Sequence, residues 1–327
     1  MDNRYKQLSY SSLLTLHSCP RQYELYKLSA DRAGDTEEET GTFNFGSLVG
    51  DGIQAILKGE KLEAILFSTF LRWKLDLLYE DTKRKKSLAY AVFAIKKFAA
   101  LHAAGFLKDY EVVIYKDKPA CELSFRIHLP GGFKYRGFVD VVLQHKFTKE
   151  VIVLELKTTS VQVIANMYKN SSQAVGYSVV LDSIFPELSA YKVMYIVYKT
   201  KDEEFELLTY PKTFYQRALW LNHLLLDTKM IELYAENKVF PMHGENCINK
   251  FGKECKYFGI CTMNTASLVK SAEDAVVQAA MQAEEDKQYE FEVQFSDLIH
   301  RQLATQITEE SGENFTGRVD TEEDMVL

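Results

Sequence analysis

The sequence predicts an α/β fold in which helices flank a mixed central sheet, with a helical N-terminal part in front of it. Apolar and β-branched runs between residues 110 and 157 are typical of buried strands. A helical pattern follows at about 164–184 and strands return at 190–198, so the core has the order β-β-β-α-β. Behind this core a group of cysteines predicts a segment organised by a bound metal centre.

The N-terminal part is predicted to be mostly helical. Residues 8–28 begin with serines that suit a helix start and carry apolar residues at helical spacing. Residues 29–42 are polar and acidic and predict a loop. Helical patterns then cover 45–57 and 61–106, with a break near Asp81. The basic run at 83–86 beside this break is either a solvated face or a contact for DNA.

In the core and the C-terminal part, strands and helices are again predicted from the spacing of apolar residues. The turn Pro130-Gly131-Gly132 predicts a hairpin between two of the strands. In chain order the expected elements are strands at 110–116, 120–129, 133–144 and 150–157, the helix at 164–184, strands at 190–198 and 204–209, a helix at 212–236, and one or two helices between 272 and 303. From 308 onward the composition is that of disorder.

Four regions follow from these patterns. We expect a helical N-terminal region at 1–107 with the first cysteine of the metal centre, and the catalytic core at 108–237. A cysteine-rich segment is expected at 238–266, and an acidic, partly disordered extension at 267–327.

Composition and charge narrow the classes of function. The chain has 327 residues, 46% hydrophobic and 26% charged, which is ordinary for a globular protein. No apolar stretch is long enough to span a bilayer and no secretory segment opens the chain, so we expect a cytoplasmic protein without a membrane partner. The net charge of −7 argues against a uniformly basic surface, although local basic groups can still bind phosphate.

Three ionisable residues lie at the ends of two neighbouring apolar strands. Asp140 follows Val139, and Glu155 and Lys157 follow a run of four apolar residues. Glu155 and Lys157 are two apart, so on a strand they share a face. Two carboxylates can hold a hard divalent cation, and a lysine beside them can stabilise a hydroxide or a phosphate. A plain ion pair between Glu155 and Lys157 is the competing interpretation.

Asp140, the pair Glu155-x-Lys157 and the later Gln173-x-x-x-Tyr177, in this order, resemble the PD-(D/E)xK nuclease superfamily. The particular resemblance is to the RecB-like branch, which includes AddB-type subunits. It implies a restriction-endonuclease-like core in which Asp140, Glu155 and the main-chain carbonyl of Leu156 bind Mg²⁺ or Mn²⁺. It further implies that Lys157 acts on the attacking water and that Gln173 and Tyr177 contact the phosphate backbone. Tyr177 as an ordinary core residue is the alternative.

The cysteines give a second signal. Cys247, Cys255 and Cys261 lie close together in the sequence, which indicates a soft metal centre. Cys19, followed by Pro20, is the candidate fourth ligand, whereas Cys121 fits a small buried residue. Iron–sulfur nucleases of the RecB-like branch are similar in placing one cysteine near the N-terminus and three behind the core. That resemblance implies a 4Fe–4S cluster, with Zn²⁺ as the alternative.

The sequence departs from the family pattern at one position. Many relatives carry a histidine in a G-x-x-x-H helix upstream of the core, and the stretch from Gly46 has Gly50 in its place. Three interpretations follow: the site works without that histidine, Asp51 substitutes as an oxygen ligand, or activity is lost, which the otherwise intact site argues against.

The resemblance implies a metal-dependent DNA exonuclease that acts on single strands or DNA ends in recombination, repair or replication, in a stand-alone or virus-encoded protein. Its partners would be DNA and a helicase or recombination protein. The alternatives are a nuclease that processes DNA ends as in CRISPR adaptation, and a non-catalytic DNA-binding or helicase-associated scaffold subunit. Intact Asp140, Glu155 and Lys157 favour an enzyme.

Overall fold

A computed structural model describes most of the chain. The described residues are 3–28, 37–74, 85–160, 163, 168–185, 191–248, 254–262, 282–283 and 286–310, with the backbone alone for 37–41, 191 and 304–310. Among the helices in these ranges, none combines the length and the apolar character needed to cross a bilayer.

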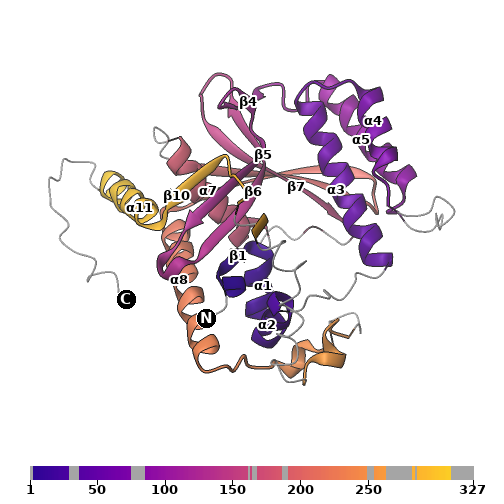
Figure 1. Cartoon of the computed structure of the whole chain (residues 1–327). Helices are drawn as coiled ribbons and strands as arrows, with labels where there is room; N and C mark the ends of the chain where they lie inside the picture. The colour runs from indigo at the N-terminus through magenta and orange to yellow at the C-terminus, as the bar shows by residue number, and fades with distance from the viewer. Residues whose placement is uncertain are drawn as a thin grey trace.

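The centre of the molecule is one mixed sheet (Figure 1). Its main path is β10-β5-β6-β7-β8-β9, and β1 and β2 both pair with β6. The strands are β1 (Gln7–Ser9), β2 (Tyr110–Val112), β5 (Cys121–His128), β6 (Lys134–His145), β7 (Val151–Thr159), β8 (Tyr191–Lys199), β9 (Glu204–Lys212) and β10 (Phe291–Gln294). Strands β5, β6 and β7 are antiparallel neighbours, β7 and β8 are parallel, and β8 and β9 are antiparallel. The predicted mixed sheet is therefore confirmed, and so is the order β-β-β-α-β.

Two hydrophobic clusters lie against the sheet. The larger contains Tyr23, Tyr135 and Trp220 and receives the helices α1 (Tyr10–Ser18), α2 (Pro20–Leu28), α7 (Ser172–Ile184), α8 (Phe214–Glu236) and α11 (Phe295–Glu310). The second contains Phe45, Phe98 and Ile152 and receives α3 (Glu37–Leu57), α4 (Leu62–Leu71) and α5 (Leu88–Ala103). Figure 1 shows α3, α4 and α5 grouped at one side of the sheet, away from α1 and α2. The central strands of the sheet thus run between two packed layers.

The N-terminal segment differs from the single helix predicted at 8–28. It opens with the 3₁₀ turn η1 (Asn3–Lys6) and strand β1, and the helix is broken at Cys19, which has an extended backbone with φ −158° and ψ 109°. A residue before proline is driven out of the helical region, so Pro20 ends α1 and begins α2. Ser9 caps α1 in a box with Ser12. The break leaves Cys19 at a corner between the two helices.

Other boundaries also differ from the sequence prediction. The loop predicted at 29–42 is wrong in part, because α3 begins at Glu37. The strand predicted at 110–116 is divided into β2 and the short β3 (Ile114–Tyr115), which pairs with β4 (Lys118–Pro119). The helix predicted at 164–184 has its regular part only from Ser172, and 164–167 lie outside the described residues. Glycines 131 and 132 both have positive φ in the 3₁₀ turn η3 (Pro130–Gly132), which confirms the hairpin turn.

The C-terminal region contributes to the sheet, which the sequence prediction did not foresee. Strand β10 pairs in parallel with β5, from Phe291 opposite Phe125 to Gln294 opposite His128. Helix α11 follows, and Gln302 donates a hydrogen bond of 2.7 Å to the buried carboxylate of Asp182 on α7. Helices were predicted between 272 and 303, so the strand at 291–294 corrects that prediction. Residues 311–327 lie outside the described part of the chain.

The basic run near α5 is only partly described. Lys85 forms an ion pair of 3.1 Å with Glu203 and donates a hydrogen bond to the carbonyl of Lys201, in the β8–β9 turn. This lysine therefore ties the start of α5 to the sheet. Residues 83 and 84 lie outside the described ranges.

Gly176 allows α7 and α8 to approach closely. A Cβ at this position would lie 2.6 Å from Cζ2 of Trp220. We expect Gly176→Ala to destabilise the protein by about 1–3 kcal/mol, because the indole ring must shift in a packed core. Chemical denaturation followed by fluorescence measures this. Gly50→Ala in α3 is the control, since a Cβ there meets open space, and it should leave stability unchanged or raise it. Equal stabilities of the two variants would contradict this packing.

Lys212 is a buried amine that donates hydrogen bonds to two main-chain carbonyls, of Tyr168 at 3.3 Å and Lys169 at 2.6 Å. Burial lowers the pKa of Lys212 from 10.5 to about 8. Between these two values the unfolded chain binds more protons than the folded one, so the free energy of unfolding rises with pH.

We therefore expect the wild-type free energy of unfolding, relative to Lys212→Met, to increase as the pH rises from about 8 to about 10.5. Urea denaturation at several pH values measures the difference. Stability curves that stay parallel across this window would show that the buried amine does not titrate as expected.

Candidate active site

The candidate site lies where β6 and β7 stop pairing. Their ladder runs from Gln144 opposite Val151 to Val141 opposite Leu154 and ends there. Asp140 and Glu155 are the next residues on the two strands. Beyond the ladder, Oδ2 of Asp140 accepts a hydrogen bond of 2.8 Å from the main-chain N–H of Leu156. A carboxylate thus replaces the backbone partner that a continuing sheet would have supplied.

Glu155 is buried, with 1% of its surface exposed. Its Oε1 lies 2.5 Å from Nζ of Lys157, and within the described residues neither of its oxygens accepts a hydrogen bond of acceptable geometry. Burial raises the pKa of Glu155, and burial together with the charge of Glu155 raises the pKa of Asp140. Burial lowers the pKa of Lys157, but the Glu155 carboxylate raises it by more, so the net shift is upward.

Helix α7 continues this network from the other side. Nζ of Lys157 donates to Oε1 of Gln173 at 3.2 Å, and Nε2 of Gln173 donates to the hydroxyl of Tyr177 at 2.7 Å. Gln173 and Tyr177 are one helical turn apart, so they lie on one face of α7. Tyr177 is also packed in the core, with its ring edge-on to Phe125 at 6.0 Å. The ring of Tyr177 is therefore a core residue, whereas its hydroxyl belongs to the polar network of the site.

The structure therefore brings the predicted residues of this site into one connected group. A hard cation needs oxygen ligands, and the group offers the carboxylates of Asp140 and Glu155. The N–H and C=O of a strand residue point to the same side, so the Leu156 carbonyl faces Asp140 as its N–H does. Within the described ranges no three His, Cys, Asp or Glu side chains form a preformed metal site. The buried Glu155 oxygens without hydrogen bonds nevertheless fit a divalent cation.

Sequence reasoning missed a second group of polar side chains beside this site. Nε2 of Gln54 on α3 donates a hydrogen bond of 2.6 Å to Glu122 on β5. Both line a cavity of about 280 Å³ between α3, α4 and β5, together with Asp51 and Arg72. Asp51, the suggested substitute ligand, is paired with Arg72 there. The sequence gives no distinct signal for Glu122, because it occupies one of the polar positions, like Ser124 and Arg126, of a predicted strand in which polar and apolar residues alternate.

The four predicted cysteine ligands also come together. Cys19, Cys247, Cys255 and Cys261 all line one pocket, which Met242 and Tyr257 help to enclose. The short helices η4 (Gly244–Asn246) and η5 (Phe258–Ile260) lie beside α2 in Figure 1. All five cysteines are free thiols, and Cys121 lies apart in the second hydrophobic cluster. Four thiols around one pocket suit a soft metal or an iron–sulfur cluster.

Hydrogen bonds tie the two halves of this cysteine pocket together. Nε of Arg21 donates to the carbonyl of Cys261 at 3.0 Å, and the N–H of Arg21 donates to the carbonyl of Pro241 at 3.0 Å. The N–H of His243 lies 3.5 Å from the sulfur of Cys19. The pocket therefore does not depend on a metal alone to hold its shape. Residues 249–253 of the segment lie outside the described ranges.

Comparison with known proteins gives one family. No curated protein matches the chain. Among solved structures, a crystal structure from Eubacterium rectale named "Putative exonuclease" is 12% identical, with a TM-score of 0.44, over 75% of this chain and 86% of that one. That likeness is too distant to carry an argument. Residues 7–262, however, match the PD-(D/E)XK nuclease superfamily, and that span holds the strands of the site, helix α7 and all five cysteines. The chain therefore belongs to the PD-(D/E)XK nuclease superfamily.

Proposed function

We propose that the protein is a metal-dependent deoxyribonuclease, most simply an exonuclease of the RecB-like branch that works in DNA recombination, repair or replication. One observation carries the proposal: the buried Glu155 carboxylate, without a hydrogen bond, lies with Asp140 and Lys157 where β6 and β7 separate. A purely structural ion pair explains Lys157 and Glu155 but leaves a second, half-buried carboxylate, that of Asp140, unexplained. The complete network argues against the scaffold alternative.

The residues divide the work of phosphodiester hydrolysis. Asp140, Glu155 and the carbonyl of Leu156 would hold Mg²⁺ or Mn²⁺, which when bound polarises a phosphoryl oxygen and lowers the pKa of water. Lys157 has three N–H donors. Gln173 accepts a hydrogen bond from one of them, and the Glu155 carboxylate lies beside Nζ as an ion pair at 2.5 Å, so a remaining donor can hold the attacking water or a phosphate oxygen. Gln173 fixes the position of Lys157, and Tyr177 fixes that of Gln173.

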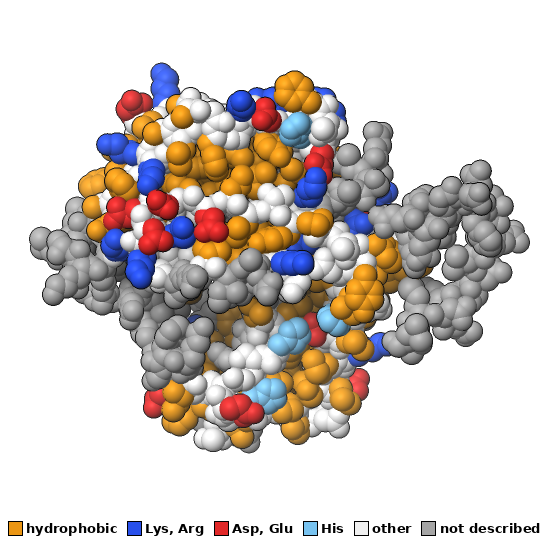
Figure 2. Space-filling model, turned by 180° about the vertical axis from the view of Figure 1, so that it is seen from behind, with side chains coloured by type: hydrophobic (Ala, Val, Ile, Leu, Met, Phe, Trp, Pro, Cys, Tyr) orange, Lys and Arg blue, Asp and Glu red, His pale blue; other side chains and the backbone are white. Residues whose placement is uncertain are grey.

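The distribution of charge on the surface supports DNA binding through local basic groups rather than through a uniformly basic surface. On the face shown in Figure 2, the described Lys and Arg side chains lie among Asp and Glu and between large hydrophobic areas. With a net charge of −7 the protein gains little from long-range steering of a polyanion. Binding of a single strand or a DNA end is then expected to depend on contacts near the site.

We also propose that Cys19, Cys247, Cys255 and Cys261 bind a 4Fe–4S cluster with a structural role. The four thiols around one pocket support this, as does the position of Cys19 at the corner between α1 and α2. Such a cluster would link the N-terminal helices to the segment behind α8, which closes a very long loop of chain. Zn²⁺ bound by the same four thiolates is the alternative.

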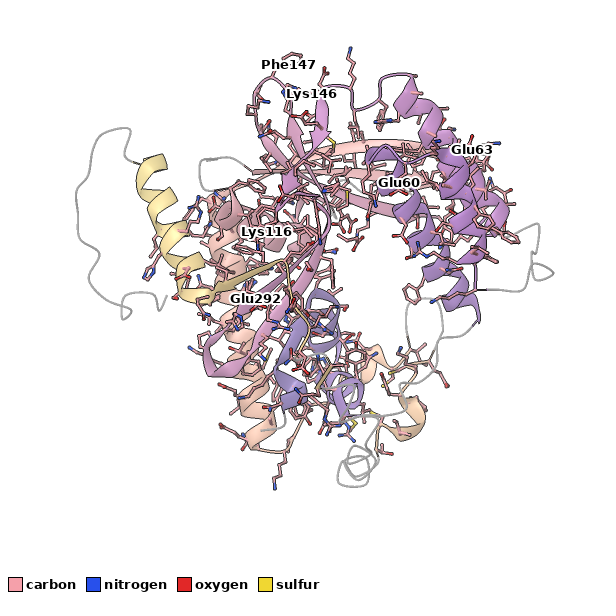
Figure 3. All side chains as sticks on the ribbon, turned by 45° about the horizontal axis from the view of Figure 1, so that its top comes forward. Glu60, Glu63, Lys116, Lys146, Phe147 and Glu292 are labelled. Carbon is pink, nitrogen blue, oxygen red and sulfur yellow. The ribbon has the colours of Figure 1, made fainter. Side chains whose placement is uncertain are left out.

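Substitutions at Asp140 and Lys157 test the site. We expect Asp140→Asn and Lys157→Met each to lower the rate of Mg²⁺- or Mn²⁺-dependent cleavage of end-labelled DNA by about 100-fold or more, because each removes a charge that acts on the transition state. Lys146→Met is the control, since Figure 3 shows Lys146 at the tip of the β6–β7 hairpin, away from the end where Asp140 lies. Cleavage at a near wild-type rate by either Asp140→Asn or Lys157→Met would contradict the proposed nuclease site.

Anaerobic purification tests the cysteine centre. We expect brown protein with iron and sulfide in a ratio of about 4:4, because a 4Fe–4S cluster contains four iron atoms and four sulfide ions. Cys19→Ser should lose the iron and melt at a lower temperature, whereas Cys121→Ser should keep both the iron and nearly the wild-type melting temperature. Colourless wild-type protein with one zinc per chain would favour the alternative metal instead.

A further inference from the structure

The first half of β6 presents basic and aromatic side chains on one face of the sheet. Tyr135 and Val139 are buried in the larger hydrophobic cluster, and successive residues of a strand face opposite sides. Lys134, Arg136 and Phe138 therefore point away from that cluster. None of these three is buried, and 37% of the Phe138 surface is exposed.

Strand β5 continues this face. It runs antiparallel to β6, and residues directly opposite each other in two paired strands have their side chains on the same side of the sheet. The three cross-strand pairs are Ser124 with Phe138, Arg126 with Arg136, and His128 with Lys134. These six positions hold three Lys or Arg side chains and no carboxylate. We call them the basic face.

The segment 286–290, which leads into β10, lies against the basic face through cation–π contacts. Nζ of Lys287 is 4.9 Å from the ring centre of Phe138 and 5.7 Å from that of Tyr289. The guanidinium of Arg126 is 4.1 Å from the ring centre of Tyr289. Aromatic and cationic groups thus alternate from β6 towards β10. This segment and β10 follow the span 7–262 that matches the family, so they add to the part of the chain that the family shares.

The charge of the basic face stays positive when the nearby carboxylates are included. Oε2 of Glu290 accepts a hydrogen bond of 3.1 Å from the N–H of Ser124, and Glu292 pairs with His128 at 2.7 Å. Figure 3 labels Glu292 on β10, beside the strands of the basic face. With Lys287 the region holds four Lys or Arg side chains against these two carboxylates. In a chain with a net charge of −7, this is a local site of attraction for an anionic ligand.

A single strand of nucleic acid combines the two features that the basic face can recognise. Its phosphates suit the lysine and arginine side chains, and its unpaired bases can stack on an exposed aromatic ring, whereas the bases of a duplex are already stacked on each other. Phe138 lies two residues before Asp140, which is about 7 Å along the strand. A nucleotide held at Phe138 is therefore a close neighbour of the candidate active site.

We propose that the basic face binds single-stranded DNA, with a base stacked on Phe138 and phosphates held by Lys134, Arg136 and Lys287. The inference rests on the proposed function, because it takes this strand as the substrate of the site at Asp140. A base that stacks on Phe138 displaces the exposed ammonium of Lys287 from the ring towards the adjacent phosphate. The C-terminal segment thus supplies one of the groups that hold the substrate.

Binding of a fluorescein-labelled 20-nucleotide oligo-dT, followed by anisotropy, is the test. Full-length protein that also carries Asp140→Asn keeps the probe intact. We expect Phe138→Ala to weaken binding by about 5-fold or more, because it removes one stacking contact. Phe138→Trp should bind about as well as the wild-type residue, whereas Phe138→Leu, which keeps apolar bulk without a ring, should bind as weakly as Phe138→Ala. Phe147→Ala is the matched control, since Figure 3 shows Phe147 at the tip of the β6–β7 hairpin.

The salt dependence of binding separates phosphate contacts from stacking. Loss of one phosphate contact should lower the slope of the logarithm of the binding constant against the logarithm of salt concentration by about 0.7 for a single strand. We expect this change for Lys134→Met and Lys287→Met, and an unchanged slope for Phe138→Ala and for the control Lys146→Met. If Lys134→Met and Lys287→Met both keep the wild-type affinity and slope, the basic face does not hold the phosphates.

Thermal unfolding and cleavage complete the test. If the contact of Lys287 with Phe138 serves only to anchor the C-terminal segment, Phe138→Leu and Lys287→Met will melt at a lower temperature yet bind oligo-dT as Phe147→Ala does, and the inference is wrong. It is also wrong if Phe138→Ala weakens binding of a blunt duplex as much as that of oligo-dT, because a duplex offers no free base to the ring.

The outcome for the basic face can be told apart from that for the nuclease site. Loss of cleavage in Asp140→Asn, together with unchanged oligo-dT binding in Phe138→Ala, would overturn only the role of the basic face. Weakened binding in Phe138→Ala, together with wild-type cleavage by Asp140→Asn, would support the basic face as a binding surface and overturn the proposed nuclease site.

Discussion

The candidate site depends on one electrostatic constraint, a buried carboxylate, that of Glu155, next to the half-buried carboxylate of Asp140. Asp140 and Glu155 lie at the point where β6 and β7 separate, and burial raises the pKa of both. A buried charge is tolerated only when other charges or hydrogen bonds compensate it. Lys157, the N–H of Leu156 and Gln173 on α7 supply part of that compensation. The remaining demand for positive charge is what makes the site suited to a divalent cation.

The fold holds this arrangement because the contributing residues lie on three well-packed elements, with Asp140 on β6, Glu155 and Lys157 on β7, and Gln173 on α7. Strands β6 and β7 are fixed by the pairs from Val141 with Leu154 to Gln144 with Val151. Helix α7 is held against α8 through the close approach of Gly176 to Trp220. On its other side, α7 is joined to α11 by the hydrogen bond from Gln302 to Asp182. The C-terminal region thus supports the helix that positions Lys157, although it lies outside the span that matches the family.

The cysteine pocket brings together parts of the chain that are far apart in the sequence. Cys19 lies between α1 and α2, and the other three cysteines follow α8. Hydrogen bonds from Arg21 to the carbonyls of Pro241 and Cys261 already join these parts. A metal centre would add a covalent link to a contact that the protein makes without it. Because α1 continues from β1, and β1 pairs with β6, such a link would also support the catalytic strand.

Much of the core could be predicted because strands and helices here follow their local patterns. The β-branched runs set β6 and β7 within about two residues, and the order of Asp140, Glu155 and Lys157 along them indicated one site. The four cysteines were likewise grouped from spacing and family likeness. By contrast, the break at Cys19 was missed because Pro20 interrupts an otherwise helical pattern. The start of α3 at Glu37 was missed because its acidic residues were interpreted as a loop, although acidic residues stabilise the N-terminus of a helix through its dipole.

The sequence by itself thus determined the family, the order of the core elements and the chemical types gathered at the site. Only the tertiary structure decided that Gln54 donates a hydrogen bond to Glu122, that Asp51 is paired with Arg72, and that 291–294 form a strand of the sheet. The reason is physical. Local patterns report which face of an element is apolar, whereas the meeting of two side chains depends on register and on local backbone conformation, such as the positive φ of Glu122. These properties arise from long-range pairing, which no short stretch of sequence contains.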